Sequence, residues 1–264
     1  MKKQKLPQWS FVTPNLYDDG HNTGISTSCA WTRGFVEILL QDKYFNDGKT
    51  LIFVTWQANG DAGGLANHVA GILLGSAVPK GQVGTVDDAY YNHYSELSSI
   101  EANWNLHTLG RWDVGANVWK VVGDKTGDAV RKWDAKIAGG PFESYLWNQS
   151  YGGVFSNAND TTHTYVAPNL DLKRNGRTVL PAIANLWGKC IKSGGGYGGR
   201  PGGNGGKSCS GLPSYYRDIV ELPDNFHPPA GFKVPIPLTP PAPIKTPITT
   251  YPYANPPAQT QAAC

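Results

Sequence analysis

The clearest pattern in the chain is a short apolar run that lies between two turn signals. Residues 51–55 are all apolar, aromatic or β-branched, with Asn46-Asp-Gly48 before them and Asn59-Gly60 after them. Such a run is typical of a strand that is buried on both faces of a mostly parallel sheet. Residues 69–74 form a second apolar run, which ends at Gly75 and predicts another buried strand.

Two stretches show the apolar spacing of helices, residues 26–41 and residues 95–104. Thr27 or Ser28 can cap the start of the first helix, and Ser95 can cap the second. The apolar residues at helical spacing are Trp31, Phe35, Ile38 and Leu39 in the first, and Leu97, Ile100 and Trp104, expected to face inward, in the second.

A charged loop follows a third predicted strand at residues 9–13. The loop places Asp18, Asp19 and His21 within four positions, and Gly20 between them is free to adopt a positive φ. One interpretation is an acid–imidazole group that faces a cleft. The other is a solvated turn.

A second histidine stands just before the predicted helix at 95–104. There His93 and the free backbone N–H groups of the helix can face an anion, although a lone loop histidine is more often structural. Farther along, Arg111 and Asp113 are expected to pair within a loop, and residues 117–122 predict a short helical segment.

Composition limits the classes of function. The chain has 264 residues and a net charge of +3, so it lacks the basic excess of a protein that binds nucleic acid. No apolar run reaches the 18 residues of a membrane span. No apolar stretch follows Met1-Lys-Lys-Gln-Lys5, so we expect no signal peptide in the chain as given.

Glycine and proline divide the chain into three predicted parts. Residues 1–138 form an α/β core, and residues 139–227 form an irregular extension. Within the extension, residues 194–206 are a Gly-rich insert, interpreted as a surface loop. Residues 228–264 are Pro-rich and predict an extended tail.

The four cysteines fit either redox setting. Cys29 lies on a predicted helix and is interpreted as a core residue rather than a nucleophile. Cys190 and Cys209 bracket the Gly-rich insert as a disulfide would, but spacing alone does not determine the pairing.

Several segments together resemble the fungal secreted acid phosphatases, which belong to the phosphoesterase family that also contains bacterial phospholipases C. The longest runs from Tyr91-Asn-His-Tyr-Ser95 to Trp112-Asp-Val-Gly-Ala-Asn117. Residues 7–21 are similar to the family's strand and loop that end in Asp-Gly-His, and residues 50–55 to the strand that carries its acidic metal-binding pair. Residues 215–218 and 234–244 also fit the fungal branch.

The resemblance implies an alkaline-phosphatase-like α/β fold with a mostly parallel sheet and flanking helices, here incomplete. It implies hydrolysis of phosphate esters by a hydroxyl nucleophile and a divalent metal ion, and a secreted or cell-wall location. By position, His21 matches the family histidine expected to contact phosphate, with Asp19 beside it, and His93 matches a supporting histidine. These three are the candidate catalytic residues.

Two departures from the family pattern change this expectation. Gln57 and Ala58 stand where the fungal enzymes carry Asp-Glu, and neither can replace a carboxylate on a hard cation. Asp61 is a possible substitute ligand. The part of the family that bears the nucleophile has no counterpart, so the chain is expected to begin partway through the fold.

We therefore expect a phosphoesterase relative that binds no divalent ion and is weak or inactive as a hydrolase. The alternatives are an active enzyme with a rebuilt site, a non-catalytic relative (a pseudoenzyme) that binds phosphate or a partner, and a truncated gene product without independent function.

Overall fold

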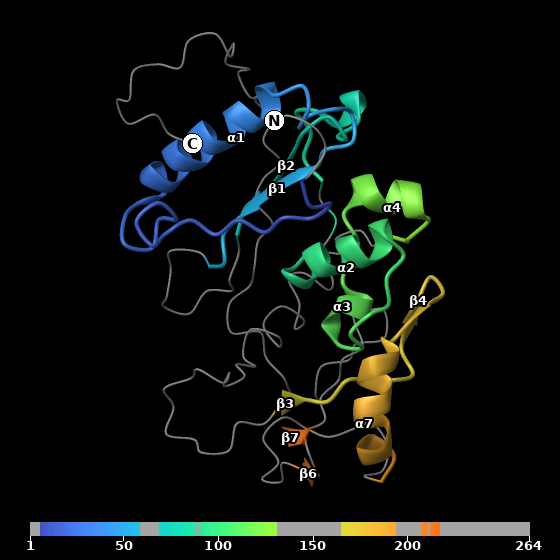
Figure 1. The fold of residues 1–264 in the computed structure, drawn as a ribbon. Helices are drawn as coiled ribbons and strands as arrows, with labels where there is room; N and C mark the ends of the chain where they lie inside the picture. The colour runs from blue at the N-terminus through green and yellow to red at the C-terminus, as the bar shows by residue number, and fades with distance from the viewer. Residues whose placement is uncertain are drawn as a thin grey trace, which may run out of the picture. The chain divides into compact units, whose positions relative to one another are not determined.

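The computed structural model describes residues 6–58, 69–87, 89, 91–130, 165–193, 207–210 and 212–216. They form two compact units, which are described separately below. Unit 1 comprises the described residues from 6 to 86, and unit 2 comprises those from 87 to 216. Figure 1 gives the order of the elements along the chain.

Unit 1 consists of one long helix and one hairpin (Figure 1). Helix α1 spans Ile25–Gln41, and strands β1 (Ile52–Thr55) and β2 (Gly71–Leu74) pair antiparallel. A short 3-10 helix, η1, spans Lys80–Gln82. The indole N–H of Trp56, just after β1, donates to Ser28 Oγ on α1 at 3.0 Å, so the hairpin end is tied to the helix.

Three predictions for unit 1 need correction. The strand predicted at residues 9–13 does not form, and the side chains of Trp9, Phe11 and Val12 are exposed. Strands β1 and β2 lie where predicted, but they form an antiparallel pair, and their residues are at most partly buried. Buried parallel strands need helices on both faces, and the described residues of unit 1 supply only α1 as a long helix.

Unit 2 contains four helices among its described residues, α2 (Tyr94–Asn103), α3 (Trp112–Gly115), α4 (Lys120–Thr126) and α7 (Pro181–Ser193). Strand β3 (Tyr165–Val166) pairs parallel with β7 (Leu212–Tyr216), which pairs antiparallel with β6 (Lys207–Cys209). Strands β4 (Lys173–Arg174) and β5 (Arg177–Thr178) form a tight hairpin.

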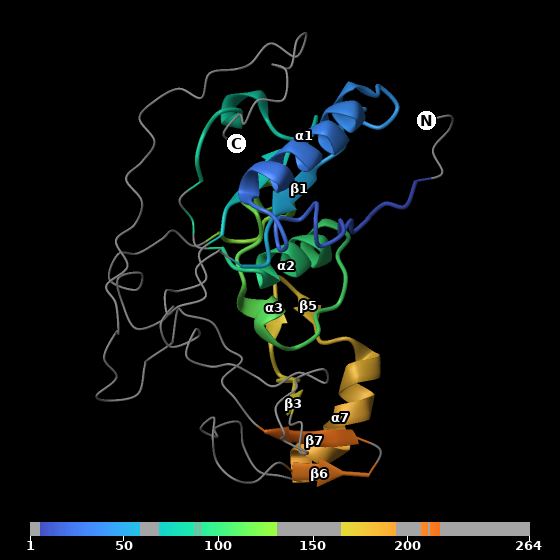
Figure 2. The same ribbon diagram turned by 90° about the vertical axis from the view of Figure 1, so that its left-hand side faces the viewer.

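The apolar core of unit 2 has two parts. Leu212 of β7 packs with one face of α7, beside which the small sheet lies in Figure 2. The buried residues of that part are Ala167, Trp187, Cys190 and Ile191. The other part lies around α3 and α4 and is formed by Val114, Ala116, Val118, Val121 and Val122.

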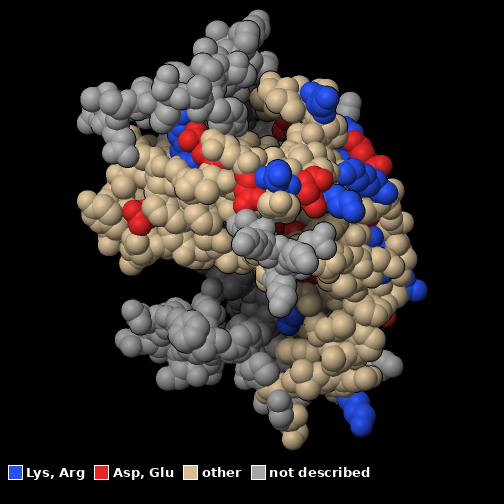
Figure 3. Space-filling view, turned by 45° about the horizontal axis from the view of Figure 1, so that its top comes forward, with Lys and Arg blue, Asp and Glu red and all other residues tan. Residues whose placement is uncertain are grey.

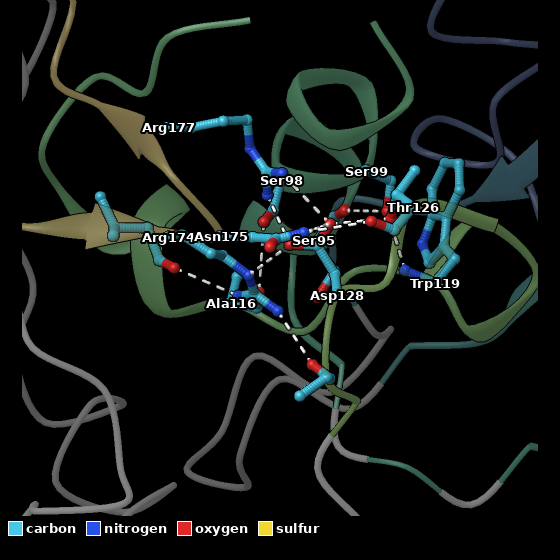
Figure 4. Close-up of polar contacts among 12 residues, drawn as sticks. Ser95, Ser98, Ser99, Ala116, Trp119, Thr126, Asp128, Arg174, Asn175 and Arg177 are labelled. Atoms are coloured by element: carbon cyan, nitrogen blue, oxygen red, sulfur yellow. Dashed lines mark hydrogen bonds and ion pairs between the residues drawn. The ribbon is translucent and has the colours of Figure 1, made fainter. Parts of the chain in front are cut away.

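The buried face of α2 is polar, contrary to the prediction. Leu97, Ile100 and Trp104 are only partly buried, whereas the buried residues are Ser95, Ser98, Ser99, Glu101 and Ala102. The serine hydroxyls can be buried because the backbone satisfies them: Ser98 Oγ donates to the Ala116 carbonyl at 3.2 Å, and Ser99 Oγ donates to Ser95 O at 2.6 Å. Small side chains thus let α2 approach the segment before α4 (Figure 4).

The predicted helix caps are also wrong. The N-cap of α1 is Gly24 and that of α2 is His93, and neither side chain makes a capping hydrogen bond. Ser95 instead lies inside α2, where its Oγ accepts the backbone N–H of Asn92 at 3.1 Å. The helix expected at 117–122 begins later, at Lys120, and the segment of Arg111 and Asp113, expected to be a loop, contains α3.

Several predictions fall outside the described residues. They include the domain boundaries at 138 and 227, the Gly-rich insert, the Pro-rich tail and the side chain of Cys209. Cys29 and Cys190 are both disulfide-bonded. Among the helices that the structure describes, none has the length and hydropathy needed to cross a membrane.

Candidate functional site

The loop that contains Asp19 and His21 is held by the side chain of Asn15. Asn15 Oδ1 accepts the backbone N–H groups of Tyr17 at 2.8 Å and Asp18 at 3.0 Å, while its Nδ2 donates to Asp18 Oδ2 at 2.7 Å. These bonds close an Asx turn, which fixes the loop without a regular element. Thr23 Oγ1 donates to the Tyr17 carbonyl at 2.6 Å and closes the other end.

Asp19 and His21 lie together, as the sequence predicts. The backbone N–H of His21 donates to Asp19 Oδ1 at 2.7 Å, and Gly20 between them has a φ of +89°. His21 is exposed, and its Nδ1 lies 3.2 Å from Asn22 Oδ1. A hydrogen bond between these two atoms would place the proton of the neutral ring on Nδ1 and leave Nε2 as the acceptor nitrogen.

The end of β1 does not fit a divalent cation. Gln57 and Ala58 follow the strand directly and are both exposed. An amide is a weaker ligand than a carboxylate for Mg²⁺ or Ca²⁺, and a methyl group is none. Asp61, the possible substitute, lies outside the described residues. Among the residues that are described, no group of three His, Cys, Asp or Glu residues could hold a metal ion.

His93 is the N-cap residue of α2 and belongs to unit 2. Its side chain is exposed and makes no capping bond. Its charge acts on Glu96 in the first turn of α2: burial raises the pKa of Glu96, and His93 opposes that rise. Asp19 and His21 are thus neighbours in unit 1, whereas His93 stands at a helix start in unit 2.

Sequence reasoning missed a buried ionic cluster in unit 2. Asp128 accepts hydrogen bonds from Arg177 Nη1 at 3.1 Å and Nη2 at 2.5 Å, and from Arg174 Nε at 3.2 Å (Figure 4). Thr126 Oγ1 and Asn175 Nδ2 also donate to this carboxylate, at 2.7 and 3.4 Å. Burial alone would raise the pKa of Asp128, but the bonds from Arg177, Thr126 and Asn175 outweigh it and lower the pKa to about 2.

The hairpin β4–β5 presents both arginines to Asp128. Its turn residues, Asn175 and Gly176, have φ values of +44° and +80°, as a two-residue hairpin turn requires. Arg174 Nη1 also donates to the carbonyls of Val114, at 3.1 Å, and Ala116. The Asn-Gly pair was the available signal for the hairpin. No local pattern in the sequence identifies Asp128 as the partner of Arg174 and Arg177. This cluster joins the hairpin to α3 and to the end of α4.

The described surface carries no dominant charge on the face shown in Figure 3. Lys and Arg side chains lie next to Asp and Glu side chains there, and wide areas between them carry neither. This distribution agrees with the small net charge of +3.

Comparison with known proteins finds similarity to phosphoesterases over part of the chain. Residues 1–107 match the model of the Phosphoesterase family. The matched part contains all three candidate catalytic residues, Asp19, His21 and His93.

The curated relatives are fungal acid phosphatases. A probable acid phosphatase of Kluyveromyces lactis is 38% identical over 188 residues, which are 71% of this chain and 42% of the relative. The phosphate-repressible acid phosphatase of Penicillium chrysogenum is 40% identical over 71% of this chain and 43% of its own. The acid phosphatase of Aspergillus niger is 44% identical over 58% of this chain and 38% of its own. The chain thus spans about two fifths of the length of these relatives. No solved structure matches it.

Proposed function

We propose that this protein acts on phosphate esters, as a phosphoesterase of the acid phosphatase type. The observation that carries the proposal is the 38–44% identity to acid phosphatases, together with the family match over residues 1–107. An alkaline-phosphatase-like arrangement of the complete fold is part of the same proposal.

In this proposal His21 contacts the phosphate group. Its exposed Nε2 can donate to a phosphoryl oxygen when the ring is protonated, or return a proton to the leaving oxygen. Asp19 accepts the backbone N–H of His21, so it holds the turn that carries the imidazole. His93, at the start of α2 in unit 2, is proposed as the supporting histidine that the family resemblance implies.

The end of β1 limits the chemistry. Members of the family are generally metal-dependent, and a divalent ion would neutralise phosphoryl charge. Since Gln57 and Ala58 supply no carboxylate, we propose that the chain binds phosphate esters and hydrolyses them weakly. A non-catalytic phosphate-binding role is the second candidate, and the same two residues favour it.

Restoring the acidic pair tests the limit on hydrolysis. The double variant Gln57→Asp/Ala58→Glu recreates the pair of the fungal enzymes. Hydrolysis of p-nitrophenyl phosphate would be measured from pH 4 to pH 7, with and without added divalent metal. We expect weak turnover in the wild type and a metal-dependent increase in the double variant. Strong metal-dependent turnover by the unaltered chain would show that other groups bind the ion.

Phosphate binding is tested separately from hydrolysis. A ligand that binds only the folded state raises the free energy of unfolding by about 2.7 kcal/mol at a hundred times its Kd. We therefore expect inorganic phosphate to raise the Tm of the wild type but not that of His21→Ala. His107→Ala is the matched control, because His107 is an exposed histidine in unit 2 whose Nδ1 lies 3.2 Å from the Thr178 carbonyl. Equal responses in all three proteins would refute the role of His21.

We also propose that the protein is secreted or held in the cell wall. Cys29 and Cys190 are disulfide-bonded, and disulfides persist mainly in oxidising compartments. Immunodetection of the protein in culture medium, cell-wall extract and lysate tests this location, and confinement to the lysate would contradict it.

A further inference from the structure

A buried carboxyl group lies at the carboxyl-terminal end of α2 without a cationic partner of its own. The Glu101 side chain is buried, with 3% of the residue exposed, and its Oε1 accepts no hydrogen bond. Its hydrogen-bonding neighbour is the carboxyl group of Asp113 on α3, which is 2% exposed. Two acidic side chains from adjacent helices therefore meet in the interior of unit 2.

Asp113 is the member of this pair that is held as an anion. Its Oδ2 accepts the backbone N–H of Leu109 at 2.7 Å, and its Oδ1 accepts that of Arg111 at 2.9 Å. Hydrogen bonds from N–H groups favour the charged form of a carboxyl group. Two carboxylates in contact in a buried site do not both ionise, so the proton resides on Glu101, which then donates to Asp113.

Several arginines face this pair. Arg177 on β5 directs both Nη atoms to Asp128 while its buried Nε has no hydrogen-bond partner, and Arg174 on β4 directs its Nε to Asp128 and its Nη1 to backbone carbonyls. Arg111, which directly precedes α3, acts on Asp113 through its charge. Arg177 and Arg174 attract the Glu101 charge and oppose its protonation. Burial and the charge of Asp113 are larger effects, and together they raise the pKa of Glu101 to about 8.

We propose that Glu101 and Asp113 form a proton-dependent contact between α2 and α3, which is closed in acid and opens when the shared proton is lost. In the protonated state a single hydrogen bond joins the two helices. After deprotonation, two buried negative charges repel each other, while Arg174 and Arg177 remain bound to Asp128. The contact makes unit 2 more stable in acid than at alkaline pH. It involves α2, the helix whose N-cap residue is His93. It does not depend on the proposed hydrolysis of phosphate esters.

The direction of the pH effect follows from linkage. The ordinary pKa of a glutamate is 4.5, which applies to the unfolded chain, and the folded pKa is higher. Between these two values the folded state holds a proton that the unfolded state has released. The stabilisation is therefore complete below about pH 4.5 and is lost progressively as pH rises to about 8.

The variant Glu101→Gln tests the proposal, because glutamine keeps the shape of the protonated acid at every pH. Urea unfolding of the full chain would be followed from pH 5 to pH 9. We expect the unfolding equilibrium constant of the wild type to rise relative to that of the variant, by about tenfold per pH unit over the steep part of this range. The two proteins should be similar near pH 5, and the variant should be the more stable at pH 8.

Two further variants make the test specific. Asp124→Asn removes an exposed carboxylate on α4 that pairs with Lys120, so its stability should change with pH in parallel with the wild type. Asp113→Asn removes the charge that faces Glu101, so the pH-dependent decrease should move to lower pH. In addition, the backbone amides of Leu109 and Arg111 should exchange faster in the wild type than in Glu101→Gln at pH 8.

Parallel pH profiles of the wild type and Glu101→Gln would overturn the proposal. If Glu101→Gln does not fold, the wild type alone can test the proposal. The side-chain carboxyl ¹³C resonance of Glu101 would be assigned by NMR and followed across the same pH range. A Glu101 resonance that titrates near pH 8 would support the contact, and one that titrates near pH 4.5 would overturn it.

Discussion

Asp128 and Arg177 form a two-point ion pair in the interior of unit 2, although 49 residues separate them in the sequence. The Asp128 side chain is fully buried, and that of Arg177 is 4% exposed. Planar guanidinium and carboxylate groups match each other in such a geometry. Arg174 donates to the same carboxylate, so one anion compensates two buried or partly buried cations. This balance makes Asp128 the residue whose loss should disturb unit 2 most.

Replacement of Asp128 by Asn should destabilise the protein by about 3–5 kcal/mol, because it leaves two cations without their anion in the interior. The matched control is Asp124→Asn, which breaks the Lys120–Asp124 pair, where both side chains are about half exposed. An exposed pair of this kind contributes at most about 1 kcal/mol. Urea unfolding at pH 5 measures both changes. Equal losses would show that burial of the Asp128 cluster contributes little.

Asp128 should also determine how the protein responds to strong acid. Its pKa in the folded state is about 2, below the ordinary value of 3.8. The stabilisation from this carboxylate is therefore present above pH 4 and is lost as pH falls towards 2, with a total of about 2 kcal/mol. Thermal unfolding between pH 2 and pH 5 should show this decrease in the wild type but not in Asp128→Asn. The Asp128 carboxylate loses its stabilising effect in strong acid, and the proposed Glu101 contact loses its effect as pH rises above 4.5. Together they place the greatest stability of the protein near pH 4–5.

Tyr91 should stabilise the start of α4. Its hydroxyl donates to Asp87 Oδ2 at 2.6 Å and accepts the backbone N–H of Lys120, the first residue of the helix, at 3.0 Å. Tyr91→Phe removes both bonds and should lower the free energy of unfolding by about 1–2 kcal/mol. Tyr94→Phe is the control, because it retains the ring that packs against Trp112 with centroids 5.7 Å apart. A similar loss in both variants would argue against the capping role.

Gly75 should be intolerant of any side chain. Its φ is +101°, and a Cβ there would lie 2.5 Å from the carbonyl oxygen of Thr50. Gly48 has a similar φ of +99°, but a Cβ there would meet no atom within 4 Å. Gly48→Ala should therefore cost only the conformational strain, about 1–2 kcal/mol, whereas Gly75→Ala should cost about 1–3 kcal/mol more because the backbone must shift. The difference in Tm between the two variants measures the steric part, and equal values would exclude it.

The sequence predicted the positions of α1, α2, β1 and β2 better than their environments. The helical spacing in 26–41 matches α1, and the apolar run that ends at Gly75 matches β2. Burial was predicted less well, because apolar spacing indicates which face prefers to be covered but not what is available to cover it. On α2 the covered face is the one with Ser98 and Ser99, since small side chains with satisfied hydroxyls permit closer approach.

The candidate phosphate-contacting loop followed from local residues. Asp19, Gly20 and His21 are adjacent in sequence, so their contact needs only a short turn that Asn15 closes. The absence of carboxylates at Gln57 and Ala58 is likewise visible in the sequence without any structure. The roles of these residues in binding phosphate remain proposals that the variants above test.

The sequence by itself determined where α1, α2, β1 and β2 form, that Asp19 and His21 share one loop, and which side chains follow β1, because these depend on residues only a few positions apart. The tertiary structure alone decided the antiparallel pairing of β1 with β2, the meeting of Glu101 with Asp113, and the choice of Asp128 as the partner of Arg177. A charged residue carries no local mark of its partner. The partner is selected by chain segments that meet only after folding, where burial makes an unmatched charge costly.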